Sequence, residues 1–207
     1  MKKYIFLLLT FLLFSTNCLA LPFNTNKPDT EKPVVQEQYL LITEQANALY
    51  AENNISEAQN LLLSIPENQR TAQNWLLLGN ILQDQGKIDD AEFMYKKSIS
   101  CDEKFYKAYY NLGNIYLNAN KPNMAVEEYQ KVVRIKPDFA YGHYNLSCAY
   151  IKLGKYTKAK FELYNALDLK NTEPDFYYNL IYILKQQKKD KEAKKYVETY
   201  NKLTGEL

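Results

Sequence analysis

The chain has 207 residues, and its 26 lysines and arginines nearly balance its 24 aspartates and glutamates. A nucleic-acid-binding protein normally carries a basic excess on its binding surface, so this balance argues against that class. The cysteines and the single histidine do not have the spacing of a metal site. The sequence also lacks H-E-x-x-H, G-x-S-x-G and a phosphate-binding glycine loop. We therefore expect no catalytic residue, cofactor, metal or small-molecule substrate.

Residues 1–20 have the organisation of a secretory signal peptide. Two lysines precede an apolar run over residues 4–14, and Cys18, Leu19 and Ala20 give the small-x-small form of a cleavage site. The run is too short to span a bilayer. The sequence thus predicts an exported bacterial protein, in the periplasm or outside the cell.

The N-terminal segment also has an alternative interpretation, in which the exported chain stays attached to the membrane. Cys18 could instead be lipidated, which would make the protein an envelope lipoprotein and give it its membrane contact, although Asn17 is unfavourable before such a cysteine. Residues 21–38 contain three prolines among polar residues and show no apolar period. We interpret them as a flexible linker.

Charge is unevenly distributed along the chain. Residues 21–105 hold 7 basic and 13 acidic residues, whereas residues 106–207 hold 17 and 11. One interpretation is a head-to-tail contact or an acidic partner at the C-terminal end. The other, which we favour, is that a run of lysines keeps the last helix soluble. These lysines are Lys188, Lys189, Lys191, Lys194 and Lys195.

A fixed period of 34 residues governs the rest of the sequence. Ala91, Ala125, Ala159 and Ala193 mark it, and each belongs to a longer pattern that begins with an aromatic residue or histidine and a leucine. A period in this range indicates stacked supersecondary units. The units cover residues 72–105, 106–139, 140–173 and 174–207, and a divergent unit covers 39–71.

Each unit has the pattern of two helices joined by a tight turn. Apolar residues at places 4, 7, 8 and 11 of a unit form one helix face. Small residues at places 8 and 20 allow close approach of a neighbouring helix. Gly86, Asn120 and Gly154 suit a left-handed turn, for which the last unit has Lys188. As N-caps of the second helices we predict Ser56, Asp89, Asn123 and Thr157.

The pattern Tyr109-x-x-Leu112-Gly113-x-x-Tyr116, followed by Ala125 and its equivalents, resembles the tetratricopeptide-repeat family. The resemblance implies an all-α, right-handed solenoid of about five helix-turn-helix repeats over residues 39–207. It also implies that a protein or peptide partner binds in a concave groove, with the protein acting as a scaffold or adaptor. The alternative is a membrane-tethered assembly factor of an envelope complex that acts through its convex face.

In this family the groove is lined by places 2, 5, 6 and 9 of the first helices. Tyrosines recur at place 5 and asparagines at place 6, and such a row of asparagines resembles one seen in peptide-binding members. A purely structural role for both rows remains open. The cations of a carboxylate clamp are missing, and Asp175 has the wrong sign for one. The predicted groove residues are Asn80, Lys107, Tyr110, Asn111, Asn114, Tyr141, Tyr144, Asn145, Tyr178, Asn179 and Tyr182.

Three further residues have structural interpretations. Cys101 and Cys148 lie on different helices of the predicted repeats, too far apart for a disulfide between them. His143 occupies place 4, where the other units carry Trp75, Tyr109 or Tyr177. We therefore expect it to pack between helices rather than to act as a base.

Overall fold

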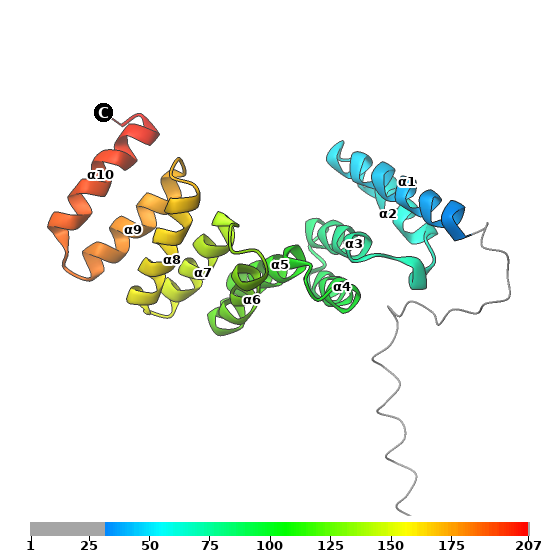
Figure 1. Cartoon of the computed structure of the whole chain (residues 1–207), viewed down its shortest axis with the longest axis horizontal. Helices are drawn as coiled ribbons and strands as arrows, with labels where there is room; N and C mark the ends of the chain where they lie inside the picture. The colour runs from blue at the N-terminus through cyan, green and yellow to red at the C-terminus, as the bar shows by residue number, and fades with distance from the viewer. Residues whose placement is uncertain (1–31, 207) are drawn as a thin grey trace, which may run out of the picture. The chain divides into compact units, whose positions relative to one another are not determined.

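The computed structural model describes residues 32–206, which belong to two compact units divided after Glu103. Every element in the described residues is helical, as Figure 1 shows. The predicted all-α repeat class is therefore confirmed. None of the described helices is long and apolar enough to cross a membrane.

The first unit contains two helix pairs. The first pair is α1 (Lys32–Ala51) and α2 (Ile55–Ser64), and the second is α3 (Ala72–Asp84) and α4 (Ile88–Cys101), with a short 3-10 helix η1 (Glu67–Gln69) between the pairs. The core of this unit joins α1, α2 and α3 through residues that are at most 4% exposed. These residues are Ala46, Ala58, Leu62, Trp75, Leu77, Leu78 and Ile81.

The start of α1 differs from the sequence prediction. The helix begins at Lys32 rather than at residue 39, so it takes in part of the range that we interpreted as a linker. Pro33 lies in the first turn, where a helix tolerates proline because the missing N–H would have no helical partner there. The rest of the predicted linker, and the whole predicted signal peptide, lie outside the described residues.

Side chains between the two pairs fix the second pair on the first. Thr71 and Asn74 form a reciprocal capping box at the start of α3, and Asn74 Nδ2 also donates to Thr43 Oγ1 of α1 at 2.7 Å. Arg70 donates to the carbonyls of Leu63 and Ile65, at the end of α2, and its guanidinium lies 5.0 Å from the centre of the Trp75 ring. These contacts satisfy backbone groups that helix ends otherwise leave unpaired.

The second unit contains three helix pairs, which are the framework of the candidate site. They are α5 (Tyr106–Asn118) with α6 (Pro122–Ile135), α7 (Ala140–Lys152) with α8 (Tyr156–Leu169), and α9 (Pro174–Gln186) with α10 (Asp190–Thr204). In addition to packing within each pair, α6 packs on α7 and α8 packs on α9. The first helices also contact each other, α5 with α7 and α7 with α9. Residues at equivalent places of these three helices can therefore share one face.

Each pair closes with a left-handed residue, as the turn residues predicted. Gly86, Asn120 and Gly154 have φ of 75°, 55° and 66°, and Lys188 adopts the same conformation with φ of 56°. The next N–H then bonds back into the first helix, for example Lys121 N to Tyr116 O at 2.8 Å. This is the bond pattern of a Schellman motif.

The predicted N-caps are wrong. The caps of α2, α4, α6 and α8 are Asn54, Lys87, Lys121 and Lys155, and none makes a side-chain cap bond. The predicted residues Ser56, Asp89, Asn123 and Thr157 lie inside the first turns. The reason is the tightness of the turn, because the residue after the left-handed position both closes the first helix and opens the second. Its carbonyl accepts from the place-20 alanine, as Lys121 O does from Ala125 N at 3.1 Å.

Glycine at place 8 is required by a specific close approach. A Cβ on Gly113 would lie 2.5 Å from Cε1 of Tyr129, and a Cβ on Gly79 would lie 2.5 Å from Cε1 of Tyr95. Both tyrosine side chains are fully buried between the helices of their own pair. The small residue therefore makes room for a large aromatic ring.

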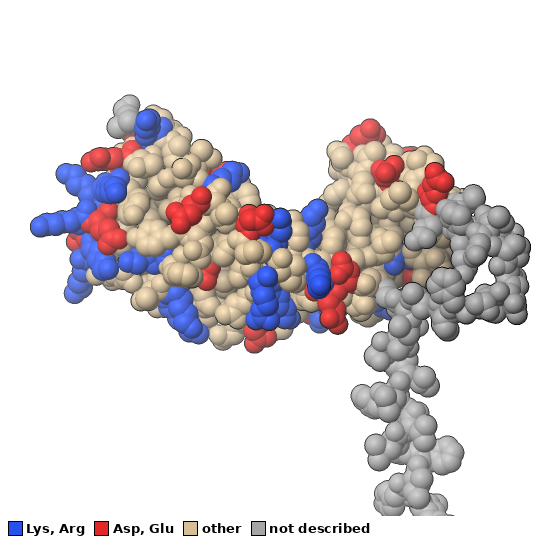
Figure 2. All heavy atoms as spheres, viewed as in Figure 1, with Lys and Arg blue, Asp and Glu red and all other residues tan. Residues whose placement is uncertain are grey.

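Charged side chains are concentrated at the end of the second unit. The five lysines of the predicted run, at positions 188, 189, 191, 194 and 195, are all exposed. Figure 2 shows blue lysine or arginine side chains gathered at the end of the molecule where Figure 1 places α10. Their exposure agrees with a solvated last helix.

Candidate functional site

Ten of the eleven predicted groove residues lie on α5, α7 and α9 of the second unit, and Asn80 lies on α3 of the first unit. We call the side of α5, α7 and α9 that carries them the A-helix face. Lys107, Tyr178 and Tyr182 are exposed on this face, and its other predicted residues are half-buried. The latter are Tyr110, Asn111, Asn114, Tyr141, Tyr144, Asn145 and Asn179.

The asparagines at place 6 bond to the preceding repeat. Asn145 Nδ2 donates to Asn114 Oδ1 at 2.9 Å, and Asn179 Nδ2 lies 3.3 Å from Cys148 Sγ. In each pair the two residues are 31 positions apart in the sequence. Each contact therefore joins place 6 of one repeat to place 9 of the repeat before it. The asparagine row thus fastens neighbouring first helices together. This finding supports the structural interpretation for these side chains.

The asparagines at place 9 accept from buried tyrosines of their own repeat. Tyr129 OH donates to Asn114 Oδ1 at 2.6 Å, and Tyr95 OH donates to Asn80 Oδ1 at 2.9 Å. Burial raises the pKa of the Tyr129 hydroxyl, so this donor stays neutral. Asn114 Oδ1 therefore accepts from both Tyr129 and Asn145, and these bonds occupy the oxygen that a peptide N–H would need.

Two phenylalanines that the sequence prediction missed support the tyrosines of the face. Phe139 packs on Tyr110 and Tyr141, with ring centres 5.3 and 6.1 Å apart. Phe176, which is 1% exposed, stacks on Tyr144 at 4.6 Å and meets Tyr141 edge-on at 5.7 Å. Aromatic pairs in such arrangements add to burial energy and hold the rings in place. The 34-residue spacing of Phe105 and Phe139 is the signal that could have identified the first of them.

Burial also keeps the inner tyrosines neutral. It raises the pKa of Tyr144 and of Tyr110, although hydrogen bonds from Asn114 and Asn145 offset part of the shift at Tyr110. The Tyr141 hydroxyl accepts from Lys170 Nζ at 2.9 Å, and that lysine also pairs with Glu173 at 2.6 Å. These phenols therefore have partners within the protein.

Tyr178 and Tyr182 differ from the other tyrosines of the face because their side chains are exposed. Their exposed fractions are 59% and 39%, and both lie on α9, one helical turn apart. Each meets a single ring, Tyr178 that of Tyr200 at 6.2 Å and Tyr182 that of Tyr156 at 6.3 Å. They are the residues of the predicted set best placed to contact another molecule.

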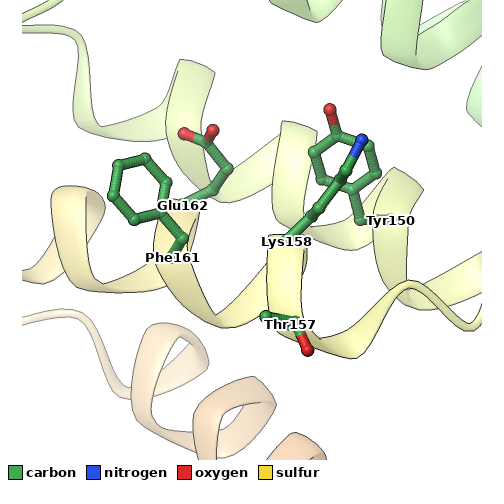
Figure 3. Close-up of a pocket in the computed structure, with 5 residues that line it drawn as sticks. All are labelled: Tyr150, Thr157, Lys158, Phe161 and Glu162. Carbon is green, nitrogen blue, oxygen red and sulfur yellow. The ribbon is translucent and has the colours of Figure 1, made fainter.

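A second surface feature lies on the second helices. Phe161 of α8 is 63% exposed and borders a shallow pocket of about 350 Å³, which Tyr150, Thr157, Lys158 and Glu162 also line (Figure 3). In Figure 3 the Phe161 ring and the Glu162 carboxylate extend from the same turn of α8. No predicted groove residue belongs to this pocket.

The Glu162 carboxylate also holds His143, the residue expected to pack between helices. His143 is 8% exposed, with Nδ1 2.7 Å from Glu162 Oε2 and Nε2 2.9 Å from the carbonyl of Pro137. Both neighbours are acceptors, and the bond to Glu162 raises the pKa of the imidazole. The structure therefore places His143 as a link between α8 and the turn before α7.

The described residues hold little that suggests chemistry. Cys148 is a free thiol, and burial raises its pKa, so it is not an activated thiolate. Within residues 32–206, no group of three or more His, Cys, Asp or Glu side chains could hold a metal ion. What the A-helix face offers is aromatic surface and neutral hydrogen-bonding groups.

Comparison with known families identifies the repeats. Models of the tetratricopeptide repeat match residues 72–105, 106–139 and 128–161. Residues 72–161 therefore consist of tetratricopeptide repeats. A search of curated proteins found no matching relative.

Solved structures share the fold at low sequence identity. "MamA 41-end from Desulfovibrio magneticus RS-1" is 18% identical, with 82% of this chain and 96% of that chain covered and a TM-score of 0.71. "MamA MSR-1 C2" is 21% identical, with 82% and 98% covered and a TM-score of 0.67. "Crystal structure of MamA" is 19% identical, with 78% and 95% covered and a TM-score of 0.70. At these identities the likeness establishes the fold alone.

Proposed function

We propose that this tetratricopeptide-repeat protein is exported and binds a protein or peptide partner on its A-helix face, as a scaffold or adaptor of the cell envelope. The observation that carries the proposal is the pair of exposed tyrosines on α9, Tyr178 and Tyr182, beside asparagines that bond within the protein. An exposed tyrosine held by one ring neighbour loses little rotamer freedom on binding. Tyrosine is accordingly enriched among the residues that dominate interface energies.

The chemistry of the face favours an extended, largely uncharged segment of the partner. Tyr178 and Tyr182 offer ring faces for apolar side chains and hydroxyls for backbone carbonyls. Around them Asn145 and Asn179 fix the first helices relative to one another, so the rings are presented by a stiff framework. A stiff framework lowers the entropy that binding costs.

Partner capture from an envelope extract tests the proposed face. Wild-type protein is compared with a Tyr178→Ala/Tyr182→Ala variant and with Phe161→Ala, which removes a ring from α8 that is more exposed than either tyrosine. Truncating two interface tyrosines should weaken retention of the partner at least ~10-fold, as expected for residues that each contribute more than about 1 kcal/mol. Phe161→Ala should retain it. Loss of the partner with Phe161→Ala alone would reject the A-helix face.

Export is tested by the mass of the mature chain. The proposal rests on the lysines, apolar run and small-x-small site within residues 1–20. Protein recovered from an exporting host should start at Leu21. A diacylglycerol mass on Cys18 would instead establish a lipoprotein.

Phe161 supports a second candidate function. As an exposed ring beside a pocket on α8, it fits an assembly factor that acts through the second helices. Phe93, at the same place of the 72–105 repeat, is also 55% exposed. In that case Phe161→Ala would abolish partner capture, and Tyr178→Ala/Tyr182→Ala would not.

A further inference from the structure

The first and last of the described helices, α1 and α10, each carry an exposed face, and the two faces differ in charge. On α1 the exposed residues Glu37, Leu41, Glu44 and Ala48 follow one another at helical spacing, with Leu40 beside them. Leu40 and Leu41 are 59% and 55% exposed. We call this set the α1 face.

The sequence around the α1 face is acidic. From residue 33 to residue 69 the chain contains glutamates and no lysine or arginine. The glutamates are Glu37, Glu44, Glu52, Glu57 and Glu67, and all of them are exposed. Lys97 pairs with Glu67 at 3.3 Å, but among the described residues neither Glu37 nor Glu44 forms an ion pair, so the α1 face attracts cationic surfaces.

The outward side of α10 has the opposite sign. Lys191, Lys194, Lys195, Glu198 and Lys202 are exposed and recur at helical spacing along it. Lys188 and Lys189 precede the helix and add two more exposed cations. We call Lys191, Lys194, Lys195, Glu198 and Lys202 the α10 face. In Figure 2 basic side chains gather at this end of the molecule.

The packing order within the repeats shows what could cover these faces. In the second unit α6 packs on α7 and α8 packs on α9, so the second helix of one pair always meets the first helix of the next. Within residues 32–206, α10 is a second helix that no described pair follows, and α1 is a first helix that no described pair precedes. The last helix of one copy and the first helix of another copy would therefore repeat a contact type that the fold already uses.

We propose that α10 of one copy packs on α1 of a second copy, so that the protein associates head to tail through oppositely charged helix faces. Lys191 and Lys195 then face Glu37 and Glu44, and the aliphatic stems of the lysines cover Leu40 and Leu41. Such a contact is heterologous, so it adds copies in a row instead of closing a symmetric dimer. Because the attraction is mainly between exposed charges, it weakens as salt is added.

Sedimentation velocity of the full chain tests this association. A concentration series from about 1 to about 100 μM, the range of a weak protein contact, is measured at low and at high salt. At about 0.05 M salt the weight-average sedimentation coefficient should rise with concentration, and at about 0.5 M the rise should disappear because screening shortens the range of the charges. A coefficient that stays constant with concentration at low salt would overturn the proposal.

Charge reversal identifies the two faces. Lys191→Glu/Lys195→Glu and Glu37→Lys/Glu44→Lys should each weaken association at least ~10-fold, because like charges then oppose each other. Mixing the two variants should restore it, since each reversed face then has an oppositely charged face to meet. The control Lys152→Glu/Lys155→Glu makes the same charge change at exposed positions outside both faces and should change association less than about 2-fold. Failure of the mixture to associate, or equal loss in the control, would overturn the assignment, provided that circular dichroism shows every variant folded.

Discussion

The repeats at 106–139 and 174–207 use the same places of the pattern for different purposes. In the first, Gly113 leaves room for the buried ring of Tyr129, whose hydroxyl bonds to Asn114. In the second, Ile181 and Tyr182 occupy the corresponding places on α9, and the side chain of Tyr182 is 39% exposed. A place on the A-helix face is thus structural in one repeat and available to a partner in another. Its role depends on the residue that the second helix brings opposite it.

The repeat at 140–173 changes the same set of residues together. Its α7 carries Ser147 and Cys148 where α5 carries Gly113 and Asn114, and its α8 carries Leu163 where α6 carries Tyr129. Without the tyrosine hydroxyl there is no need for an asparagine oxygen, and without the ring there is space for a serine Cβ. The three places therefore form one packing unit.

The largest effect on the free energy of unfolding should come from the buried leucine that both repeats share at place 7. Leu112 and Leu180 occupy place 7 and are 2% and 0% exposed. Leu112→Ala and Leu180→Ala should each lower the free energy of unfolding by about 2–5 kcal/mol, as large-to-small changes in a packed core do. Urea denaturation measures both. If either variant were as stable as Lys152→Ala, a change at an exposed position, the 34-residue frame would be misplaced in that repeat.

A smaller effect on stability should distinguish the repeat with glycine and tyrosine at places 8 and 24 from the repeat with serine and leucine there. Gly113→Ser should cost about 1–3 kcal/mol, because the new Cβ overlaps the Tyr129 ring. Tyr129→Leu in the same chain reproduces the Ser147 and Leu163 pair and should recover part of that loss. A double-mutant cycle on thermal unfolding gives the coupling between the two places. Additive effects would show that the glycine and the tyrosine do not depend on each other.

The polar groups of the A-helix face should likewise divide into groups that stabilise the fold and groups that are available to a partner. Asn145→Ala removes the bond to Asn114 and should lower the free energy of unfolding by about 0.5–1.5 kcal/mol. Tyr182→Ala removes an exposed ring and should stay within about 0.5 kcal/mol of wild type. Chemical denaturation of both variants checks the difference. The reverse ranking would return the asparagine row to a binding role.

The sequence predicted the framework of these repeats better than the contacts on their surface. The 34-residue period and residues such as Gly86 and Asn120 were sufficient to place the helix pairs and their turns. The partners of Asn145 and Asn179 depend on how far one repeat is offset from the next, a distance that no single repeat encodes. Phe139 and Phe176 were missed because they lie at places 34 and 3, which helical spacing alone does not assign to the face.

The smallest expected effect is a pH dependence of the melting temperature that arises from His143 in the second unit. Both ring nitrogens of His143 face acceptors, and the hydrogen bond to Glu162 raises its pKa above the ordinary value of 6.5. A raised pKa in the folded protein means that this stabilisation is complete below pH 6.5 and is lost as the pH rises through the folded pKa. The melting temperature of wild type should therefore fall across this window more than that of His143→Gln. Identical pH profiles would show that the link carries no charge.

Site-specific photocrosslinking tests most directly which face meets the partner. A photoreactive side chain is placed at Tyr182 on α9 or at Phe161 on α8, both exposed, in cells that contain the partner. We expect a crosslinked adduct from position 182 and none from position 161. An adduct from 161 alone would contradict this expectation and assign recognition to the second helices.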